Sequence, residues 1–552
     1  MRCGALTGLL VRIALPLFVF AANAFSQGTT ADWPTYGGDY SASRHSQLNQ
    51  INAANVADLV PVWAFQTGDY ESGLQSTPIV IDGVMYISTG TNLIYALDAA
   101  SGDLIWQYEY DGRHPISAAF FRQNRGVAVG HGLVFLGTVD NSVLAVDQRT
   151  GREVWRVRVQ DPAQCGCMIS AAPLLVKDLV VVGGTGGDSA HRGSLTAFHA
   201  KTGKFAWRFY ITPAPGEPGN ETWAGDSWRF GGGAPWMTGS YDPDLDLIFW
   251  GTGNAAPDLD GAAREGDNLY TASVIALDPD TGKLRWHYQE VPHETWDYDS
   301  AYETILADLP VDGKMRKLLL HPTKTGFLWV LDRTNGEFVG AWRTVEDITW
   351  VSGITEDGKL VGRKELVVGE ENKVCPGISG AKSWNQASFS PQTGLLYVPL
   401  LRFCSDYYVR PQAPREGRGY AGGFWRIVRA PAGQEYPSGI AAFDPVSGEK
   451  KWEYSYKYVI LSSVLTSAGG LIFAGDGEGE FFALDAETGE KLWTFKTGSG
   501  HRGSSIAYEV DGRQYVATPS GWGSMGGGAR SFFPELSRTG GALFVFALPG
   551  SK

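Results

Sequence analysis

The stretch IYALDAASGDLIW, residues 94–106, decides the fold of this chain. Its apolar beginning predicts a half-buried β-strand. Asp98 and Gly102 are typical of a tight turn, in which glycine supplies a positive φ. Trp106 then follows on a returning strand. Because one such hairpin cannot bury its own apolar face, the stretch predicts a unit that stacks against copies of itself.

The same pattern occurs seven times, with copies that begin at Ile94, Val143, Leu195, Val274, Leu328, Ile440 and Phe481. Only the tryptophan of the fifth copy, Trp342, is displaced along its strand. Two end segments supply half a unit each. Residues 61–65 form a tryptophan strand without a preceding turn, and residues 543–548 form an apolar strand without a following one. Joining them in one unit would close a ring of eight.

The repeat therefore predicts an all-β fold, an eight-bladed β-propeller in which the repeat tryptophans dock between blades. A closed ring of blades removes the exposed edges that single sheets would have. Two intervals between copies are lengthened by insertions, residues 213–233 and 410–437. Such insertions usually decorate one face and build a site.

The composition excludes several classes of protein. Hydrophobic residues make up 43% of the 552 residues, and 19 are tryptophan, which provides the apolar mass that disordered chains lack. Glycine is abundant, with 71 residues, but has no collagen-like period. The net charge of −13 makes the chain a poor nucleic-acid binder, because phosphate contacts need clustered Lys and Arg. The acidity favours solubility, or a basic partner protein.

The first 24 residues are predicted to be a secretory signal peptide. Arg2 and Arg12 precede or flank an apolar run that ends near Ala22, and Ala24 closes a small-residue cleavage site. The alternative is an uncleaved membrane anchor, but the run falls short of the ~20 residues that a span needs. No later segment is long and apolar enough to span, so residues 25–552 are expected to be a propeller exported to the periplasm.

The cysteine count agrees with an oxidising compartment. Cys3 leaves with the signal peptide, and the four others form an even set that predicts disulfides. Cys375 and Cys404 lie near strand-like runs and can cross-link neighbouring strands. Cys165 and Cys167 are too close for an ordinary bridge but can form a small strained ring. No C-x-x-C-H motif for covalent haem is present, and no Cys/His cluster has zinc-ligand spacing.

The repeat, the glycine-rich segment 223–236 and the run Trp296-Asp297-Tyr298 resemble the eight-bladed quinoprotein alcohol dehydrogenases. The resemblance covers nearly all of the mature chain. It implies pyrroloquinoline quinone (PQQ), a metal ion and the oxidation of an alcohol, or of a sugar or aldehyde. Electrons would pass to a separate acceptor such as a c-type cytochrome, since the chain has no haem motif.

Two other functions remain open. A non-enzymatic scaffold propeller of envelope assembly would share the repeats and the signal peptide. It would not be expected to keep Asp297, Asn254, Arg125, Lys324 and Trp236 together. A protein that binds PQQ without turnover is the second alternative.

The resemblance implies two catalytic residues. Asp297 matches the general base that takes the alcohol proton, and Lys324 matches the basic residue near the reactive quinone oxygens. The implied metal ligands are Asp188, Asn254, Asp297 and Asp299. Asp188 stands where the family normally has the longer Glu. Asp299 stands where lanthanide-type members have Asp and calcium-type members a small neutral residue, which favours a lanthanide over Ca²⁺.

The resemblance also implies a cofactor-binding set: Gln75, Arg125, Ser170, Thr185, Gly186, Gly187, Trp236, Lys324, Ser383, Trp384, Gly521 and Trp522. Trp236 matches the stacking tryptophan, and Arg125 matches an arginine that binds a carboxylate. This chain also departs from the family. Gln75 replaces a common Glu, Leu461 replaces a pocket tryptophan, and Ala119 and Phe120 replace two adjacent cysteines over the cofactor. The Cys165–Cys167 pair is a possible substitute lid. These departures indicate a divergent member with a roomier pocket.

Overall fold

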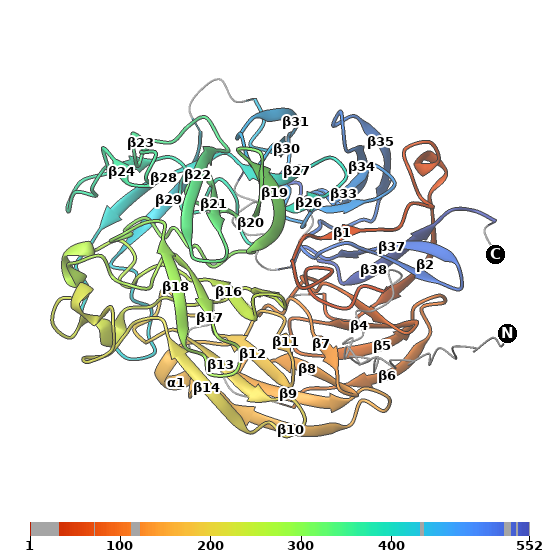
Figure 1. Ribbon diagram of the computed structural model, residues 1–552, viewed down its shortest axis with the longest axis horizontal. Coiled ribbons are helices and arrows are strands. Elements are labelled where there is room, and N and C mark those ends of the chain that lie inside the picture. Colours follow the sequence, from red (N-terminus) through yellow and green to blue (C-terminus); the bar gives the residue numbers. More distant parts are fainter. Residues whose placement is uncertain are drawn as a thin grey trace.

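The computed structural model describes Met1 and residues 32–70, 72–111, 122–430, 435–523, 532–536 and 539–550. Apart from Met1, the predicted signal peptide lies outside the described residues, as do Ala119 and Phe120. Within the described residues, eight sheets, here called blades 1 to 8, surround a common centre (Figure 1); each has four antiparallel strands, and one of them carries a fifth strand in parallel. This is the arrangement expected of an eight-bladed propeller, and the all-β prediction is confirmed.

The strands of blades 1 to 4 are, in order, β3 (Ile79–Ile81), β4 (Val84–Ser88), β5 (Ile94–Asp98) and β6 (Leu104–Tyr108); β7 (Ala128–Gly130), β8 (Leu133–Gly137), β9 (Ser142–Asp147) and β10 (Glu153–Arg158); β11 (Leu174–Val176), β12 (Leu179–Gly183), β13 (Ser194–His199) and β14 (Phe205–Tyr210); β15 (Ser240–Asp242), β16 (Leu247–Gly251), β17 (Ser273–Leu277) and β18 (Leu284–Gln289).

The strands of blades 5 to 8 are β19 (Ile305–Val311), β20 (Lys314–Pro322), β21 (Phe327–Asp332) and β22 (Glu337–Arg343); β26 (Ser388–Ser390), β27 (Leu395–Leu401), β30 (Ser438–Phe443) and β31 (Lys450–Tyr456); β32 (Leu465–Ser467), β33 (Leu471–Gly475), β34 (Glu480–Asp485) and β35 (Lys491–Lys496); β36 (Ile506–Val510), β37 (Arg513–Ser520), β38 (Ala542–Ala547) and β2 (Val60–Gln66). The short first strands of neighbouring blades contact one another and so line the centre.

The remaining elements are short. Strand β1 (His45–Ser46) joins blade 7 in parallel to β32. Accessory sheets are formed by β23 (Gly353–Ile354) with β24 (Leu360–Val361), and by β25 (Asn372–Val374), β28 (Phe403–Val409) and β29 (Gly423–Arg429). The helices are α1 (Pro162–Cys165), η1 (Val56–Asp58), η2 (Asn220–Thr222), η3 (Ser227–Phe230) and η4 (Gly261–Arg264). Among the helices of the described part, none has the length and apolar character needed to cross a bilayer.

The repeat tryptophans dock between blades as predicted. Trp106 of blade 1 donates from Nε1 to the carbonyl oxygen of Gln148 at 3.0 Å, and its ring covers Gly151 of blade 2 so closely that a Cβ there would lie 2.5 Å away. The same ring-on-glycine contact joins Trp63 to Gly102, Trp155 to Gly203, Trp207 to Gly282, Trp286 to Gly336, Trp342 to Gly448 and Trp452 to Gly489. The displaced Trp342 therefore docks like the others.

The two ends of the chain close the ring. Strand β2 pairs antiparallel with β38, with Phe65 opposite Leu543. Trp493 of blade 7 donates from Nε1 to the carbonyl oxygen of Leu59, directly before β2, at 3.1 Å. Blade 8 thus combines the half units that the sequence predicts at residues 61–65 and 543–548.

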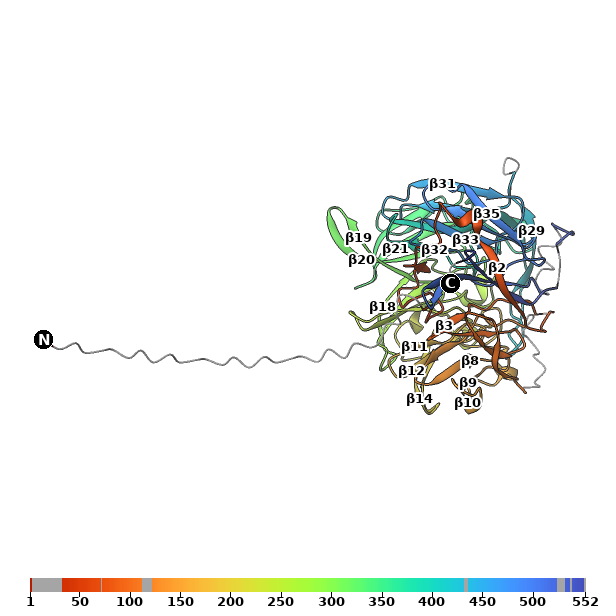
Figure 2. The ribbon, with the colours of Figure 1, turned by 90° about the vertical axis from the view of Figure 1, so that its right-hand side faces the viewer.

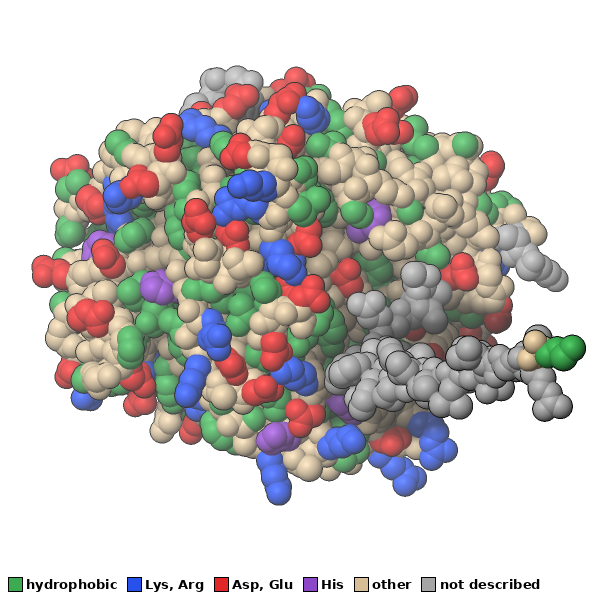
Figure 3. All heavy atoms as spheres, in the orientation of Figure 1, with side chains coloured by type: hydrophobic (Ala, Val, Ile, Leu, Met, Phe, Trp, Pro, Cys, Tyr) green, Lys and Arg blue, Asp and Glu red, His purple; other side chains and the backbone are tan. Residues whose placement is uncertain are grey.

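The two faces of the ring differ. Figure 2 shows the β19–β20 hairpin projecting from one side and strand β29 of the accessory sheet at the other. In the face of Figure 3, acidic side chains are scattered over the surface with basic ones between them, as expected for a charge that serves solubility.

Both predicted disulfides are present in the structure. Cys375–Cys404 joins the end of β25 to its neighbour β28, across a sequence separation of 29 residues. Cys165–Cys167 closes a ring with a separation of 2. The larger loop removes more conformational freedom from the unfolded chain.

Replacing Cys375 and Cys404 by serine is therefore expected to lower the free energy of unfolding by about 3 kcal/mol. The matched Cys165→Ser/Cys167→Ser variant should lose roughly half as much, because it opens a far smaller loop. Urea unfolding followed by near-ultraviolet circular dichroism measures both losses. An equal or larger loss in the short-loop variant would contradict the chain-entropy explanation.

Candidate active site

All predicted site residues lie at one end of the ring. In an antiparallel blade, the connection into the first strand and the connection between the second and third strands fall at the same end. The first kind carries Gln75, Arg125, Ser170, Trp236, Asp297, Asp299, Ser383 and Trp384. The second kind carries Thr185, Gly186, Gly187, Asp188, Asn254, Lys324, Gly521 and Trp522. The Asp-Gly turns of the repeat join third and fourth strands and lie at the opposite end.

Lys324 lies among several buried carboxylates, here called the acidic centre, and contacts two of them. Its Nζ donates to Asp297 Oδ2 at 3.1 Å, to the Asp297 carbonyl oxygen at 2.7 Å and to Asp299 Oδ2 at 2.8 Å. Trp236 Nε1 donates to Asp299 Oδ1 at 2.9 Å, and the backbone N–H of Asn254 reaches the same oxygen at 3.3 Å. Residues from blades 4 and 5 thus meet at one carboxylate.

Asn254 links this centre to a second pair of acids. Its Nδ2 donates to Asp258 Oδ1 at 2.9 Å and lies 3.4 Å from Asp188 Oδ1. The amide oxygen faces Gly187, where a Cβ would lie 2.3 Å away, so glycine is required for this approach. Asp258 was not predicted from the sequence. It is fully buried, and its contact with Nδ2 holds the orientation of the Asn254 amide.

The centre holds an excess of negative charge. Four buried carboxylates, those of Asp188, Asp258, Asp297 and Asp299, lie in this centre, and the ammonium of Lys324 contacts two of them, those of Asp297 and Asp299. Burial and the charge of Asp299 raise the pKa of Asp188, and burial with the charge of Asp188 raises the pKa of Asp258 well above its ordinary value. A multivalent cation would relieve this repulsion.

The pKa values of the two predicted catalytic residues, Asp297 and Lys324, are strongly shifted. Burial raises the pKa of Asp297 well above its ordinary value, and the charges of Asp188 and Asp299 act in the same direction against the opposing effect of Lys324. Burial lowers the pKa of Lys324, but the charges of Asp297 and Asp299 outweigh it, so this pKa stands well above its ordinary value. Such perturbed groups cluster at functional sites.

The loop that carries both acids is anchored by the aromatic residues between them. Trp296 and Tyr298 are fully buried in the core, so the intervening Asp297 and the following Asp299 face the centre. Glu294 Oε1 accepts from the backbone N–H groups of Trp296 and Tyr298. Asp297 has φ of 60°, a left-handed conformation that is uncommon for residues other than glycine and that recurs at functional sites.

Next to the acidic centre, Arg125 and Trp236 form a cation–π contact. The Arg125 guanidinium lies 5.1 Å from the centre of the Trp236 ring, and its Nη1 donates to Ser170 Oγ at 2.7 Å. Burial lowers the pKa of Arg125 to about 10. Trp236 also meets Tyr302 edge-on, and the Ser383 hydroxyl lies beside Tyr302.

A second arginine, Arg502, was not predicted from the sequence. It lies in the connection into β36, and its guanidinium is 5.0 Å from the Trp384 ring and 6.0 Å from the Trp522 ring. Its Nη1 donates to the Trp522 carbonyl oxygen at 3.1 Å. With the Gln75 amide oxygen turned toward it, Arg502 also donates to Gln75 from Nη2 at 2.7 Å.

Backbone hydrogen bonds link the connections that hold the two arginines, with the connection of Gln75 between them. The N–H of Ser504 donates to the Ser76 carbonyl oxygen, that of Thr77 to Arg125, and that of Arg125 to Ser170. Blades 8, 1, 2 and 3 are thus linked in order. The predicted residues Gln75, Arg125 and Ser170 are consecutive along this chain of contacts.

The insertion at residues 410–437 reaches the candidate metal ligands from blade 6. The N–H of Tyr420 donates to the Asp188 carbonyl oxygen at 2.7 Å, and the N–H of Ala190 donates to the carbonyl oxygen of Arg418. The Cys165–Cys167 disulfide lies against the connection that carries Asp188, since a Cβ on Gly186 would be 3.3 Å from Cys167 Cβ. The insertion thus contacts the connection that carries Asp188.

The other predicted cofactor residues have mainly backbone roles. Thr185 Oγ1 accepts from the backbone N–H of Met168 at 3.1 Å. Gly521 accepts from the N–H of Leu74 at 3.0 Å, and a Cβ there would collide with backbone atoms. Leu461, at the position of the replaced tryptophan, packs with Trp522.

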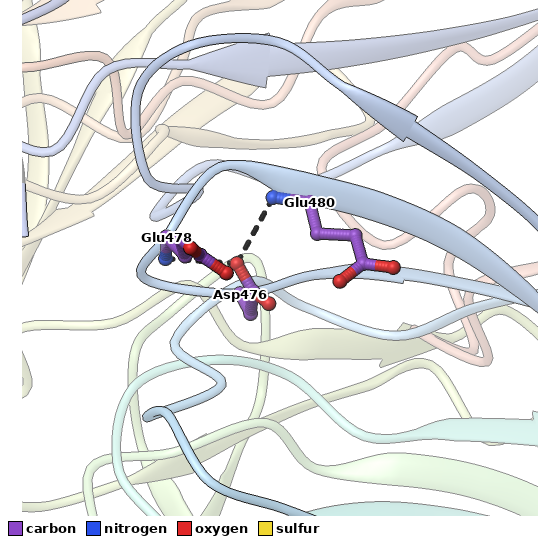
Figure 4. Close-up of side chains that lie close together, drawn as sticks. All are labelled: Asp476, Glu478 and Glu480. Atoms are coloured by element: carbon purple, nitrogen blue, oxygen red, sulfur yellow. Dashed lines mark hydrogen bonds between the residues drawn. The ribbon is translucent and has the colours of Figure 1, made fainter.

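A second group of acidic side chains lies elsewhere, and two of its three members are paired with lysines. Figure 4 shows Asp476, Glu478 and Glu480, whose ligand atoms lie within 4.8 Å of one another. Asp476 Oδ1 accepts from the backbone N–H groups of residues 478–480, as in a turn cap. Glu480 is paired with Lys491 Nζ at 2.9 Å, and Glu478 lies 3.6 Å from Lys496 Nζ. These contacts explain the cluster without a metal.

The residues present fit a planar anionic cofactor and a cation. Arg125 and Arg502 are both buried, and no described carboxylate pairs with either guanidinium. Their own Nε atoms have no hydrogen-bond partner, and neither have the buried indole nitrogens Trp384 Nε1 and Trp522 Nε1. Such atoms are costly unless a ligand or water satisfies them. A polycarboxylate quinone requires flat aromatic rings and unpaired cations, and a metal ion requires an acidic centre. The site supplies all three.

The chain matches known proteins over nearly its full length. The family model for the PQQ glucose/ethanol/alcohol dehydrogenase β-propeller domain matches residues 33–347 and 457–516. A quinohemoprotein alcohol dehydrogenase of Comamonas testosteroni is 37% identical, covering 94% of this chain and 77% of that protein. The quinoprotein alcohol dehydrogenase PedH of Pseudomonas putida is 36% identical, covering 93% and 91%. The solved structure of a europium-containing methanol dehydrogenase is 34% identical, with a TM-score of 0.89 and coverage of 94% and 98%.

This chain belongs to the PQQ-dependent quinoprotein alcohol dehydrogenases. The resemblance stated from the sequence is therefore confirmed, and so is the propeller fold. The scaffold alternative finds no support among these relatives.

Proposed function

We propose that this protein oxidises an alcohol, or a sugar or aldehyde, with PQQ and one metal ion at the end of the ring that carries the candidate site residues. The observation that carries the proposal is the contact of Lys324 with both Asp297 and Asp299, next to the indole of Trp236. Oxidation of an alcohol by a bound quinone needs a general base, a positive charge and an aromatic ring close together.

In this proposal the residues divide the work. PQQ, when bound, supplies the quinone that accepts two electrons from the alcohol. Trp236 and Arg125 orient it, together with Gln75, Ser170, Thr185, Gly186, Gly187, Ser383, Trp384, Gly521 and Trp522. Asp297 takes the proton of the substrate hydroxyl as general base, because its buried carboxylate is perturbed and adjoins the metal ligands. Lys324 supplies a fixed positive charge beside it.

Asp188, Asn254, Asp297 and Asp299 would hold the metal ion. Oxygen donors of this kind suit hard cations. The formal excess of three negative charges, from four carboxylates and one ammonium, favours a trivalent lanthanide over Ca²⁺. Asp299 is the residue that adds the extra charge.

We place the enzyme in the periplasm, with a separate c-type cytochrome or similar protein as electron acceptor. The predicted signal peptide and the disulfides support an oxidising compartment outside the cytoplasm. The acceptor is proposed as a separate protein because the sequence contains no C-x-x-C-H haem motif.

Reconstitution tests the proposal. Metal-free apoprotein from a host without PQQ should gain dye-reducing activity over a panel of alcohols only when PQQ and La³⁺ or Ca²⁺ are added together. Omitting either is expected to lower the rate by about 100-fold or more, because PQQ supplies the quinone that accepts the electrons and the metal ion supplies charge stabilisation. Absence of turnover with every metal would instead favour a protein that binds PQQ without catalysis, or a scaffold.

A further inference from the structure

Arg502 carries a buried positive charge that no described residue neutralises. Its side chain is 3% exposed, and its partners are a carbonyl oxygen, an amide oxygen and two indole rings. Nε has no partner. Burial and the charge of Arg125 lower the pKa of Arg502 to about 9. An isolated buried charge is expensive, so it is normally paired when the protein is in its working state.

The surroundings define what the missing partner must be. Trp384 and Trp522 flank the guanidinium, so the free edge is bordered by flat apolar surfaces. The connection of Arg502 is joined to that of Arg125 through residues 76 and 77, by the bonds from Ser504 N–H to the Ser76 carbonyl oxygen and from Thr77 N–H to the Arg125 carbonyl oxygen, and Arg125 adjoins the Trp236 ring. A ligand with a flat ring system and more than one anionic group would satisfy both arginines.

We propose that Arg502, held by the neutral amide of Gln75, is a second cationic anchor that binds a carboxylate of PQQ opposite Arg125. This inference rests on the proposed function and adds a specificity-determining residue to it. Gln75 orients the guanidinium without cancelling its charge, since an amide oxygen accepts hydrogen bonds but is uncharged. The charge of Arg502 thus remains available for the ligand.

The proposal predicts opposite effects on stability and on binding. Arg502→Met keeps a long unbranched side chain but removes the guanidinium and its charge. In the apoprotein it should raise the thermal midpoint by about 2 °C, because an unpaired buried charge is lost. With PQQ, titrated into apoprotein in the presence of La³⁺ and followed by tryptophan fluorescence, the Kd should rise roughly 30-fold, as for the loss of a charge-assisted pair.

Gln75→Glu provides a second, independent variant. A carboxylate at this position would pair internally with Arg502 and compete with the ligand. The apoprotein should become more stable, and the Kd for PQQ should rise about 10-fold. This variant keeps Arg502 itself, so it tests the charge even if Arg502→Met folds poorly.

Arg44 supplies the matched control. It is fully buried and also lacks a carboxylate partner, but it donates to the carbonyl oxygens of Tyr36, Val464 and Ser505 and to Gln386 Oε1. Arg44→Met should therefore lower the thermal midpoint of the apoprotein and leave the Kd for PQQ within about 3-fold. A purely structural Arg502 would behave like Arg44.

A ligand control isolates the carboxylate contact. PQQ trimethyl ester lacks the anionic groups, so wild type and Arg502→Met should bind it with equal affinity. Wild type that binds PQQ with the same Kd as Arg502→Met and Gln75→Glu would overturn the inference while leaving the proposed function intact. Wild type that binds no PQQ would overturn the proposed function and the inference with it.

Discussion

Replacing Asp297 by asparagine is expected to lower kcat by about 1,000-fold, within the range that general-base catalysis contributes. The amide keeps the shape of the side chain and an oxygen that can accept from Lys324 Nζ, which lies 3.1 Å from Oδ2. It cannot take a proton from an alcohol. Binding of PQQ should change by no more than a few fold, because the cofactor partners lie in other connections.

Steady-state dye reduction and the PQQ titration measure the two effects separately. Asp242→Asn is the matched control: Asp242 is another buried acid, but it ends β15 at the opposite end of blade 4 and pairs with Arg333 Nε at 2.7 Å. That variant should lose stability and keep normal turnover per folded molecule. If Asp297→Asn retained more than about one tenth of kcat, another residue would have to act as the base.

The fold could be predicted because seven of the eight blades contain the same local sequence pattern. Each turn glycine, such as Gly151, lies under the tryptophan of the preceding blade, so every copy keeps both residues, four positions apart in all copies but the fifth. The half units at the two ends also predicted the closure of β2 on β38. The accessory sheet of β25, β28 and β29 was not predicted, because insertions follow no repeat.

The candidate site could be predicted only through motifs that resemble the family. Asp297, Asn254 and Trp236 lie in such motifs. The structure brings Asn254 and Trp236 to the Asp299 carboxylate, and Asp297 to Lys324, which contacts the same carboxylate. Arg502 and Asp258 gave no comparable signal. Each is a single charged residue in a connection without a motif, and its partners come from other loops of the tertiary fold. Contacts between these irregular loops, unlike the docking of each repeat tryptophan on a turn glycine, leave no periodicity in the sequence.

Replacing Asp299 by alanine is expected to lower La³⁺-supported activity by about 100-fold or more while Ca²⁺-supported activity stays within several fold. The reason is the charge balance of the centre. Removing one of four carboxylates reduces the attraction for a trivalent ion more than for a divalent one, since the Coulomb energy scales with the charge of the ion. The larger coordination shell of the lanthanide also loses an oxygen.

The structure adds a complication that a second variant resolves. Asp299 Oδ1 accepts from Trp236 Nε1, so alanine removes a contact of the stacking ring as well as a charge. Asp299→Asn keeps an oxygen acceptor for the indole and removes only the charge. If charge is the cause, both variants should lose La³⁺-supported activity, and the luminescence lifetime of bound Eu³⁺ should shorten as water replaces the carboxylate. Loss in alanine alone would assign the effect to Trp236, and equal loss with Ca²⁺ would defeat the lanthanide proposal.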